Sequence, residues 1–169
     1  MNESLRHLRG ARIYFDANVF IYHHDEDAKY QPCLDALWEM LQDGNLQVVT
    51  SEFSLAECLV WPIKSKDRGA QHHFANTLSN GNQLIVVPIS REILIEAARL
   101  RGLHGLEMPD AIHGATAKIA RCRWFLTNDA FLATASGAKS ILLDSLVREF
   151  DGLSFELSSQ GLPPPKNGC

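Results

Sequence analysis

The chain has 169 residues, 46% of them hydrophobic and 21% charged, which is ordinary for one soluble globular domain. Its 16 basic and 20 acidic side chains give a formal net charge of -4, so a nucleic acid or an anionic membrane would have to be recognised by a local patch and not by the overall charge. The sequence has no apolar stretch long enough to span a membrane, no signal-peptide core and no C-x-x-C pair among its four cysteines, so we expect a cytoplasmic protein with reduced thiols.

The first predicted strand is the apolar run "RIYF" at residues 12–15, and Asp16 follows it directly. Apolar residues then recur with helical spacing over residues 34–41, and "DGN" at 43–45 is a typical helix end. The second predicted strand is "LQVVT" at 46–50. The first third of the chain therefore reads as strand, helix, strand.

A second helical segment is predicted to begin near Ser51, and Glu57 lies one to two turns from its start. Pro62 is expected to stop this helix, because proline lacks the N–H group that a helix interior needs. A third strand follows in "LIVVPI" at 84–89.

The segment after the third strand is long enough for two helices. Ser90 is a suitable cap for the first, whose apolar residues recur over 93–100, and "RGLHGLE" at 101–107 separates the two. Pro109 suits the first turn of the second helix, and Asp110 follows it.

The fourth predicted strand is "WFLT" at 124–127, followed closely by Asp129, and we expect a fifth at 140–143. Three consecutive prolines near the end of the chain favour an extended or disordered tail over residues 151–169. Residues 1–150 are therefore predicted to form a single domain.

Strands that alternate with helices predict an α/β fold with a parallel sheet of four to five strands. In such a sheet the carboxyl ends of the strands share one edge, which places Asp16, Glu57, Asp110 and Asp129 together. Singly, each acid has a simpler explanation. Asp16 and Asp129 suit helix caps, Asp110 complements a helix dipole, and Glu57 lies three residues after Ser54, as in a capping box.

Together, the four acids indicate a metal site. Like charges about 4 Å apart repel by roughly 4 kcal/mol at an effective dielectric of 20, and a divalent cation relieves that repulsion. Oxygen ligands without a Cys–His pattern at zinc spacing favour Mg²⁺ or Mn²⁺. Because such ions activate water and stabilise in-line displacement at phosphorus, the sequence predicts phosphodiester hydrolysis.

The chain resembles the PIN-domain ribonucleases, especially the VapC-like toxins of bacterial and archaeal toxin–antitoxin pairs. The resemblance covers residues 12–145 and rests on four segments in order: "FDANVFIY" with Asp16, "TSEFSLAE" with Glu57, "MPDAIHGATA" with Asp110 and "FLTNDAF" with Asp129. It implies a three-layer α/β/α fold and a metal-dependent endoribonuclease that is the toxin of a type II pair. It also implies a small antitoxin partner and frequently a homodimer.

The resemblance further implies a role for the residues of these segments. Asp16, Asp110 and Asp129 would ligate Mg²⁺ or Mn²⁺, and Glu57 would complete the catalytic pocket. The polar residues beside them would orient the ligands or the attacking water: Asn18, Ser51, Thr127 and Asn128.

RNA contacts are predicted at two groups of basic residues. The first group is Lys64, Lys66 and Arg68, with His72 and His73; the second is Lys118 and Arg121, with Arg123. The alternatives are a solvated loop for the first group and stabilisation of a helix C-terminus for the second.

Several other side chains are expected in structural roles. His113, one turn after Asp110, is predicted to be a hydrogen-bonded structural histidine, with a position near the substrate as the alternative. Trp61 is expected in the core, with a partner surface as the alternative, and Cys58 is expected to be a small buried residue and not a nucleophile.

Two other functions are alternatives to the endoribonuclease. A phosphatase for small phosphate esters would use a similar acidic rim, but its covalent aspartyl type has a second aspartate two residues after the first, where this chain has Asn18. A non-catalytic module of the same fold would bind RNA or protein, but degenerate relatives usually lose acids and this chain keeps all four. The metal-dependent endoribonuclease is therefore the leading prediction.

Overall fold

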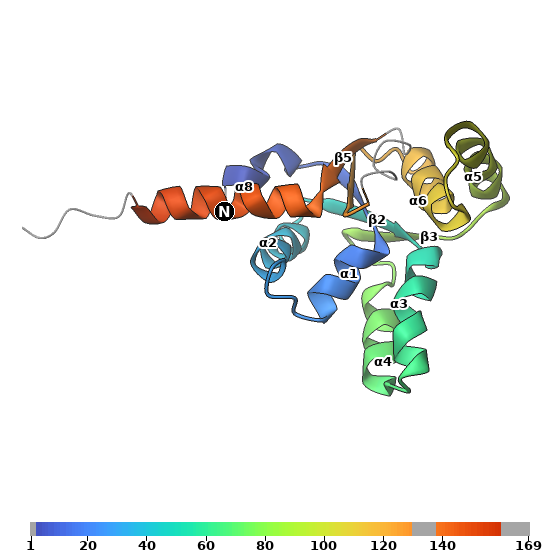
Figure 1. Cartoon of the computed structure of the whole chain (residues 1–169), viewed down its shortest axis with the longest axis horizontal. Coiled ribbons are helices and arrows are strands. Elements are labelled where there is room, and N and C mark those ends of the chain that lie inside the picture. The colour runs from blue at the N-terminus through green and yellow to red at the C-terminus, as the bar shows by residue number, and fades with distance from the viewer. Residues whose placement is uncertain (1–2, 130–137, 160–169) are drawn as a thin grey trace, which may run out of the picture.

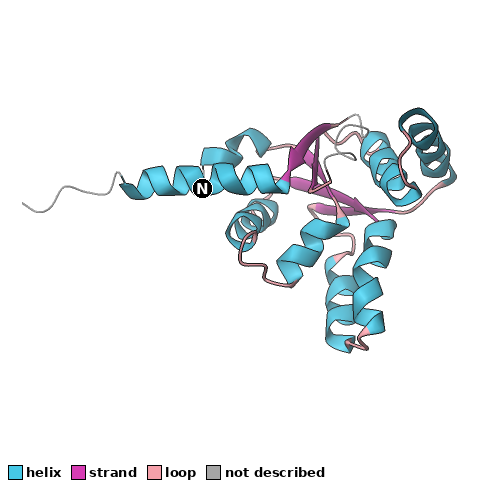
Figure 2. Ribbon diagram, in the orientation of Figure 1, coloured by secondary structure: helices cyan, strands magenta, loops and turns pink. Residues whose placement is uncertain are grey.

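The computed structural model of the chain describes residues 3–129 and 138–159 (Figure 1). Helices lie on both sides of a central sheet, as Figure 2 shows. The elements in chain order are the 3₁₀ helix η1 (Glu3–Leu8), β1 (Arg12–Phe15), α1 (Ala17–His24), α2 (Gln31–Gln42), β2 (Gln47–Ser51), α3 (Glu52–Lys64), α4 (Arg68–Thr77), β3 (Leu84–Val87), α5 (Arg91–His104), α6 (Met108–Ile119), β4 (Trp124–Thr127), β5 (Lys139–Leu142) and α8 (Leu143–Ser159).

The sheet has five parallel strands in the order β3-β2-β1-β4-β5, which confirms the predicted parallel α/β fold. Strands β2 and β3 are added in turn on one side of β1, and the chain then returns to place β4 on the other side of β1. Ligands of open α/β sheets bind where the strand order reverses in this way, outside the carboxyl ends of the strands. Phe15 of β1 pairs with Leu126 of β4, so the residues after these two strands leave the sheet side by side.

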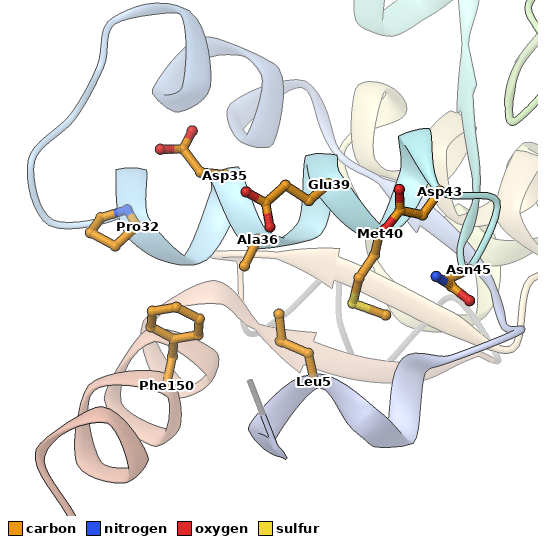
Figure 3. Close-up of a pocket in the computed structure, with 9 residues that line it drawn as sticks. All are labelled: Leu5, Pro32, Asp35, Ala36, Glu39, Met40, Asp43, Asn45 and Phe150. Carbon is orange, nitrogen blue, oxygen red and sulfur yellow. The ribbon is translucent and has the colours of Figure 1, made fainter. Parts of the chain in front are cut away.

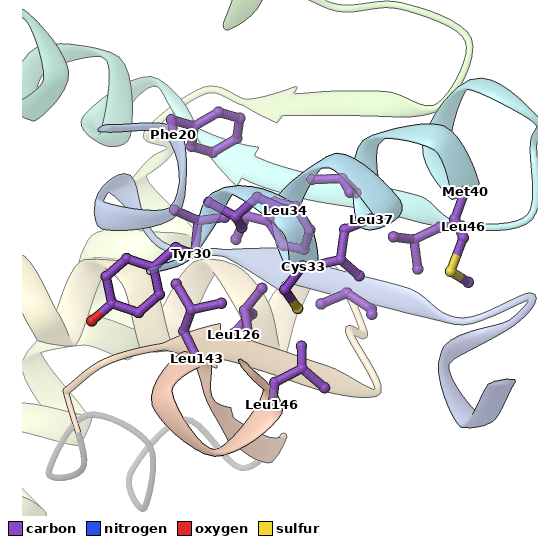
Figure 4. Close-up of a cluster of buried hydrophobic side chains, with 14 of the residues drawn as sticks. Phe20, Tyr30, Cys33, Leu34, Leu37, Met40, Leu46, Leu126, Leu143 and Leu146 are labelled. Carbon is purple, nitrogen blue, oxygen red and sulfur yellow. The ribbon is translucent and has the colours of Figure 1, made fainter. Parts of the chain in front are cut away.

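Side chains alternate between the two faces of each strand, and the helices cover both faces. Ile13 and Phe15 point into the main apolar cluster with α1, α2 and α8, the cluster that Figure 4 shows at close range. Tyr14 points to the opposite face, where it stacks on Phe125 with ring centroids 4.9 Å apart beneath α6. Helix α5 packs outside α6 through a further apolar cluster. These layers confirm the predicted α/β/α arrangement.

The helix starts follow the predicted capping pattern. Ser90 caps α5 by accepting a hydrogen bond from the backbone N–H of Ile93, and Pro109 lies in the first turn of α6. The two helices separate at Gly105, whose φ of +70° belongs to the left-handed region that glycine adopts without strain.

The prediction that Pro62 stops its helix was wrong, because α3 continues through it to Lys64. Proline removes only one intrahelical hydrogen bond here, and the helix ends within its next turn. The carbonyl of Pro62 accepts hydrogen bonds from the Gln71 side chain of α4 and from the backbone N–H of Asp67, which fixes the α3–α4 hairpin.

The prediction of an extended tail is corrected over residues 151–159, which continue α8 to Ser159. Leu146, Val147 and Phe150 pack in or against the main apolar cluster and so hold the first half of the helix in place. Adding residues to a formed helix costs much less than starting one, which explains the extension. The three prolines of the predicted tail lie outside the described residues.

Among the described residues, three cysteines are buried free thiols: Cys33, Cys58 and Cys122. Burial raises the pKa of each thiol to about 12, so Cys58 behaves as the small apolar residue that was expected. No helix in the described part of the chain is long and apolar enough to cross a membrane.

Candidate active site

Asp16 lies at the centre of the site, directly after β1 and only 5% exposed. Its Oδ1 accepts a hydrogen bond of 2.7 Å from the backbone N–H of Ala17 and so caps α1. Its Oδ2 accepts a 2.7 Å bond from the hydroxyl of Thr127 and lies 3.5 Å from the amide nitrogen of Asn18. The capping explanation for Asp16 is therefore correct, and it describes only one of its two oxygens.

Thr127 connects the ends of the two strands that border the site. Its buried hydroxyl donates to Asp16 and accepts a 3.0 Å hydrogen bond from the backbone N–H of Asp129. The two bonds hold the segments after β1 and β4 in a fixed relation. One hydroxyl group thus holds the carboxylate of Asp16 and the backbone of Asp129 at the edge where the strand order reverses.

Glu57 reaches the same place from α3 through a histidine of α6. Nε2 of His113 lies 2.7 Å from Oε2 of Glu57 and 3.8 Å from Oδ1 of Asp16. Ligand atoms of the three side chains all lie within 4.8 Å of one another, which is a spacing that suits a metal ion. The capping-box explanation for Glu57 is wrong, because the N-cap of α3 is Ser51 and the carboxylate of Glu57 bonds to His113.

Buried hydrogen bonds hold His113 from its other side. Its Nδ1 lies 2.8 Å from the hydroxyl oxygen of Tyr14, and that hydroxyl donates to Oγ of Ser51 at 3.2 Å. Ser51 also accepts from the backbone N–H of Ser54 at 3.3 Å. If Tyr14 gives its only proton to Ser51, then Nδ1 of His113 must donate to Tyr14 while Nε2 donates to Glu57. The network is thus complete when the ring of His113 carries both protons.

The charges around His113 agree with this arrangement. Burial opposes the charged form, but the hydrogen bond to Glu57 and the negative charges of Asp16 and Asp110 together raise the pKa of His113 above its ordinary value. A positive ring between carboxylates partly offsets their mutual repulsion. Protonation of His113 would therefore give the acidic group an internal counter-ion.

Asp110 and Asp129 complete the acidic group, although they stand outside the three residues with the closest spacing. Burial first, and next the negative charge of Asp129, raises the pKa of Asp110, with smaller contributions from Asp16 and Glu57. This influence means that all four predicted acids share one electrostatic environment. Oxygen atoms predominate in it, which fits Mg²⁺ or Mn²⁺, and the repulsion that raises the pKa of Asp110 is what a bound cation would remove.

The four neighbouring polar residues have different surroundings. Thr127 and Asn18 contact Asp16, whereas Ser51 contacts Tyr14. Asn128 points away from the acids. Its amide donates to the hydroxyl of Tyr30, and its oxygen accepts from the backbone N–H at the second residue of α8. Asn128 thus fastens β4 to α2 and α8, and a direct part in orienting metal ligands does not follow from its contacts.

The second group of basic residues does not border the acids. Lys118 and Arg121 lie at the C-terminal end of α6, while Asp110 lies in its first turn. The adjoining carbonyl of Ala120 accepts from Arg12 at the start of β1, which places this end at the opposite edge of the sheet. Lys118 also forms a 2.6 Å ion pair with Glu96. These contacts support the structural explanation for the second group.

The first group lies around the connection between α3 and α4. Lys64 ends α3, Lys66 follows it, and Arg68 opens α4, and all three side chains are exposed. In Figure 1 the α3–α4 hairpin projects away from the sheet. Helix α3 begins beside the acids and extends towards this group, about 10 Å from Glu57 to Lys64 along its axis.

One prediction about an individual side chain needs correction, and another is confirmed. Trp61 is 66% exposed on α3 and does not belong to the core, unlike Trp38 and Trp124, which pack against the main apolar cluster. His113 is a buried, hydrogen-bonded residue as predicted, but its bond to Glu57 places it within the acidic group. In the sequence, the signal for this position of His113 was its spacing of one helical turn from Asp110.

A separate cavity of about 440 Å³ lies between η1, α2 and α8 (Figure 3). Asp35 and Glu39 of α2 lie along one side of it with Asp43, which follows the helix, and Leu5 and Phe150 lie on the other. None of the four acids at the strand ends lines this cavity, so it plays no part in the site.

The sequence matches the PIN domain family over residues 13–137. None of the curated proteins compared with the chain matches it.

Several solved structures resemble the chain. A toxin–antitoxin complex from Klebsiella pneumoniae is 21% identical with a TM-score of 0.58, covering 78% of this chain and 97% of that one. VapBC2 from Rickettsia felis, bound to a DNA fragment from its promoter, is 15% identical with a TM-score of 0.60, covering 77% and 97%. FitAcB from Neisseria gonorrhoeae is 17% identical with a TM-score of 0.57, covering 78% and 97%. At these identities the likeness is one of fold.

Proposed function

We propose that this chain, which belongs to the PIN domain family, is a divalent-metal-dependent endoribonuclease that hydrolyses phosphodiester bonds in RNA. The observation that carries the proposal is the convergence of four acids at the edge between β1 and β4. Asp16 and Glu57 meet through His113, and the raised pKa of Asp110 reports the nearby charges of Asp129, Asp16 and Glu57. Such a concentration of carboxylates is costly unless a cation offsets it.

Each acid has a proposed part in the reaction. Asp16, Asp110 and Asp129 hold Mg²⁺ or Mn²⁺, and when bound the metal supplies water activation and neutralises charge on the phosphate oxygens. Thr127 fixes the orientation of Asp16 through its 2.7 Å hydrogen bond. His113 fixes the carboxylate of Glu57 in the same way, so that Glu57 is oriented to accept a proton from the attacking water.

We also propose that the chain is the toxin of a type II toxin–antitoxin pair in the cytoplasm. The similar structures include a toxin–antitoxin complex and VapBC2, which supports an antitoxin partner for a chain of this fold. Large apolar side chains exposed outside the acid site offer area for protein contacts, including those of a homodimer: Val60 and Ile63 on α3, and Leu94, Ile95 and Leu103 on α5.

Cleavage of a structured RNA by the purified protein tests the enzymatic proposal. We expect cleavage with Mg²⁺ or Mn²⁺, none with EDTA, and loss of at least about 100-fold in Asp16→Asn, with Asp43→Asn as a control acid on the far cavity. A small chromogenic phosphate ester should remain intact, because the site lacks a second aspartate at position 18. Equal cleavage by wild type and Asp16→Asn would contradict the proposal.

A further inference from the structure

A pocket of about 340 Å³ opens beside the acid site, between α1, α3 and α4. Its lining includes His24, Asp25, Glu57, Trp61 and Phe74, and we call it the Trp61 pocket. We propose that the Trp61 pocket binds one nucleobase of single-stranded RNA, next to the phosphate that lies at the acids. This inference rests on the proposed function and adds to it a binding site for one base.

The Trp61 pocket is continuous with the acid site through Glu57. The carboxylate of Glu57 bonds to His113 within the acidic group, and the same side chain lines the pocket. Glu57 is 34% exposed, so it is accessible from the pocket side. A nucleotide whose phosphate lies at the acids therefore has this pocket within reach of its base.

Aromatic rings line part of the pocket, beside the apolar side chains of Ile21, Cys58 and Pro62. Trp61 is 66% exposed, although a tryptophan of this size normally loses water contact on folding. The rings of His24 and Phe74 pack against each other with centroids 4.7 Å apart, and Phe74 is only 3% exposed, so His24 and Trp61 are the rings that a base could reach. Unstacked RNA bases are recognised by stacking on such rings, and this recognition requires a single strand or a loop.

The polar groups of the pocket favour a base over a phosphate or an apolar peptide side chain. Asp25 and Glu57 place two carboxylates there, which repel phosphate and accept hydrogen bonds from N–H groups on a base edge. An apolar peptide side chain would have to desolvate both carboxylates. Val60 and Ile63, the apolar residues better suited to a protein partner, are exposed on α3 but do not line this pocket.

The spacing along α3 supports a path for the RNA backbone. Glu57, Trp61 and Lys64 follow one another at four and three residues, so they share one face of the helix. The exposed Lys64 lies about 4.5 Å beyond Trp61 along the axis, on the side away from the acids. Along α3, Glu57 thus lies nearest the metal, Trp61 comes next where a base would stack, and Lys64 follows where the next phosphate would lie.

Tryptophan fluorescence measures base binding without cleavage. A six-nucleotide single-stranded RNA, titrated in EDTA, should quench the wild-type signal and leave Trp61→Phe unquenched, while Trp124→Phe keeps the quenching. Binding of a labelled hexamer, measured by anisotropy, should weaken about 5- to 100-fold in Trp61→Ala and less in Trp61→Phe. The same hexamer with abasic sites should quench little, because the effect requires the base.

Steady-state cleavage provides the second readout. Trp61→Ala should raise KM by a similar factor and change kcat less, because Trp61 lies outside the acids. If Trp61→Ala binds and cleaves RNA as the wild type does, or if abasic RNA quenches equally, the base-binding inference is wrong. If the hexamer quenches Trp61 but no divalent metal supports cleavage, the nuclease proposal fails while the base-binding inference stands.

Discussion

His113 and Glu57, which are 56 residues apart in the sequence, are joined by a hydrogen bond of 2.7 Å at the centre of the acidic group. The bond connects α6 to α3 across the carboxyl edge of the sheet. The far side of the His113 ring contacts Tyr14 of β1 at 2.8 Å, so three elements meet at one buried imidazole. The orientation of Glu57 therefore depends on a residue that need not contact substrate.

Replacement of His113 by alanine is expected to reduce RNA cleavage about 10- to 100-fold, because Glu57 loses the group that orients it. The unfolding free energy should also fall by about 1–3 kcal/mol, since the buried hydroxyl of Tyr14 loses a partner. Cleavage rates and urea unfolding measure the two effects. His104→Ala, at an exposed position on α5, is the control, and a His113→Ala enzyme with wild-type kcat would contradict the proposed role.

Thr127→Val should lower both stability and cleavage, because valine keeps the shape of threonine but neither donates to Asp16 nor accepts from Asp129. Loss of these buried bonds is expected to cost about 1–3 kcal/mol of unfolding free energy and about tenfold in cleavage. Thr127→Ser keeps the hydroxyl and is the matched control. If the valine and serine variants cleave RNA equally well, the hydroxyl does not position Asp16.

The fold was largely predictable from the sequence. The alternation of apolar runs and helical spacing located every strand of the sheet to within one residue, apart from the far end of the third. That strand was predicted at 84–89 and ends at Val87, because Pro88 has no N–H to donate to a neighbouring strand. Local patterns sufficed here, since strand placement depends mainly on short-range periodicity.

The side-chain geometry of the site was less predictable. The topology rule brought Asp16, Glu57, Asp110 and Asp129 to one edge, but the bond between His113 and Glu57 depends on how α3 and α6 are rotated against the sheet. Packing over long sequence separations sets that rotation. The prediction that Trp61 lies in the core failed for a related reason. Helix α3 projects with α4 from the sheet, so it has less core to cover than its apolar residues suggest.

Asp144 provides a test of stability against pH. Its carboxylate accepts hydrogen bonds of 2.7 Å from Lys29 and from Tyr30, and these bonds lower the pKa of Asp144. Because the folded-state pKa is depressed, the stabilisation is present above the ordinary value of 3.8 and is lost as the pH falls through the lower value. The bonds hold the start of α8 against the start of α2, so the prediction concerns folding and not catalysis.

Asp144→Asn should therefore lower the melting temperature by about 1–3 °C at pH 7, and the difference from wild type should shrink as the pH approaches 3. Calorimetry between pH 3 and pH 8 measures the effect. Glu149→Gln, at an exposed position on the same helix, is the control for a lost negative charge. A difference that stays constant over the whole range would show that the charge of Asp144 is not what stabilises the contact.

Asp110→Asn is expected to separate stability from metal binding. Burial and the charge of Asp129 raise the pKa of Asp110, so keeping this carboxylate ionised costs the folded metal-free protein stability relative to the unfolded chain. Removing that charge should leave the metal-free melting temperature unchanged or raise it by about 1–3 °C.

In wild type, Mn²⁺ should raise the melting temperature because it binds the folded state alone, and most of this rise should disappear in Asp110→Asn. Thermal unfolding with EDTA and with increasing Mn²⁺ measures both effects, and Asp43→Asn should behave as wild type. If Asp110→Asn destabilises the metal-free protein and keeps the full response to Mn²⁺, then Asp110 is a structural residue and the metal is held elsewhere.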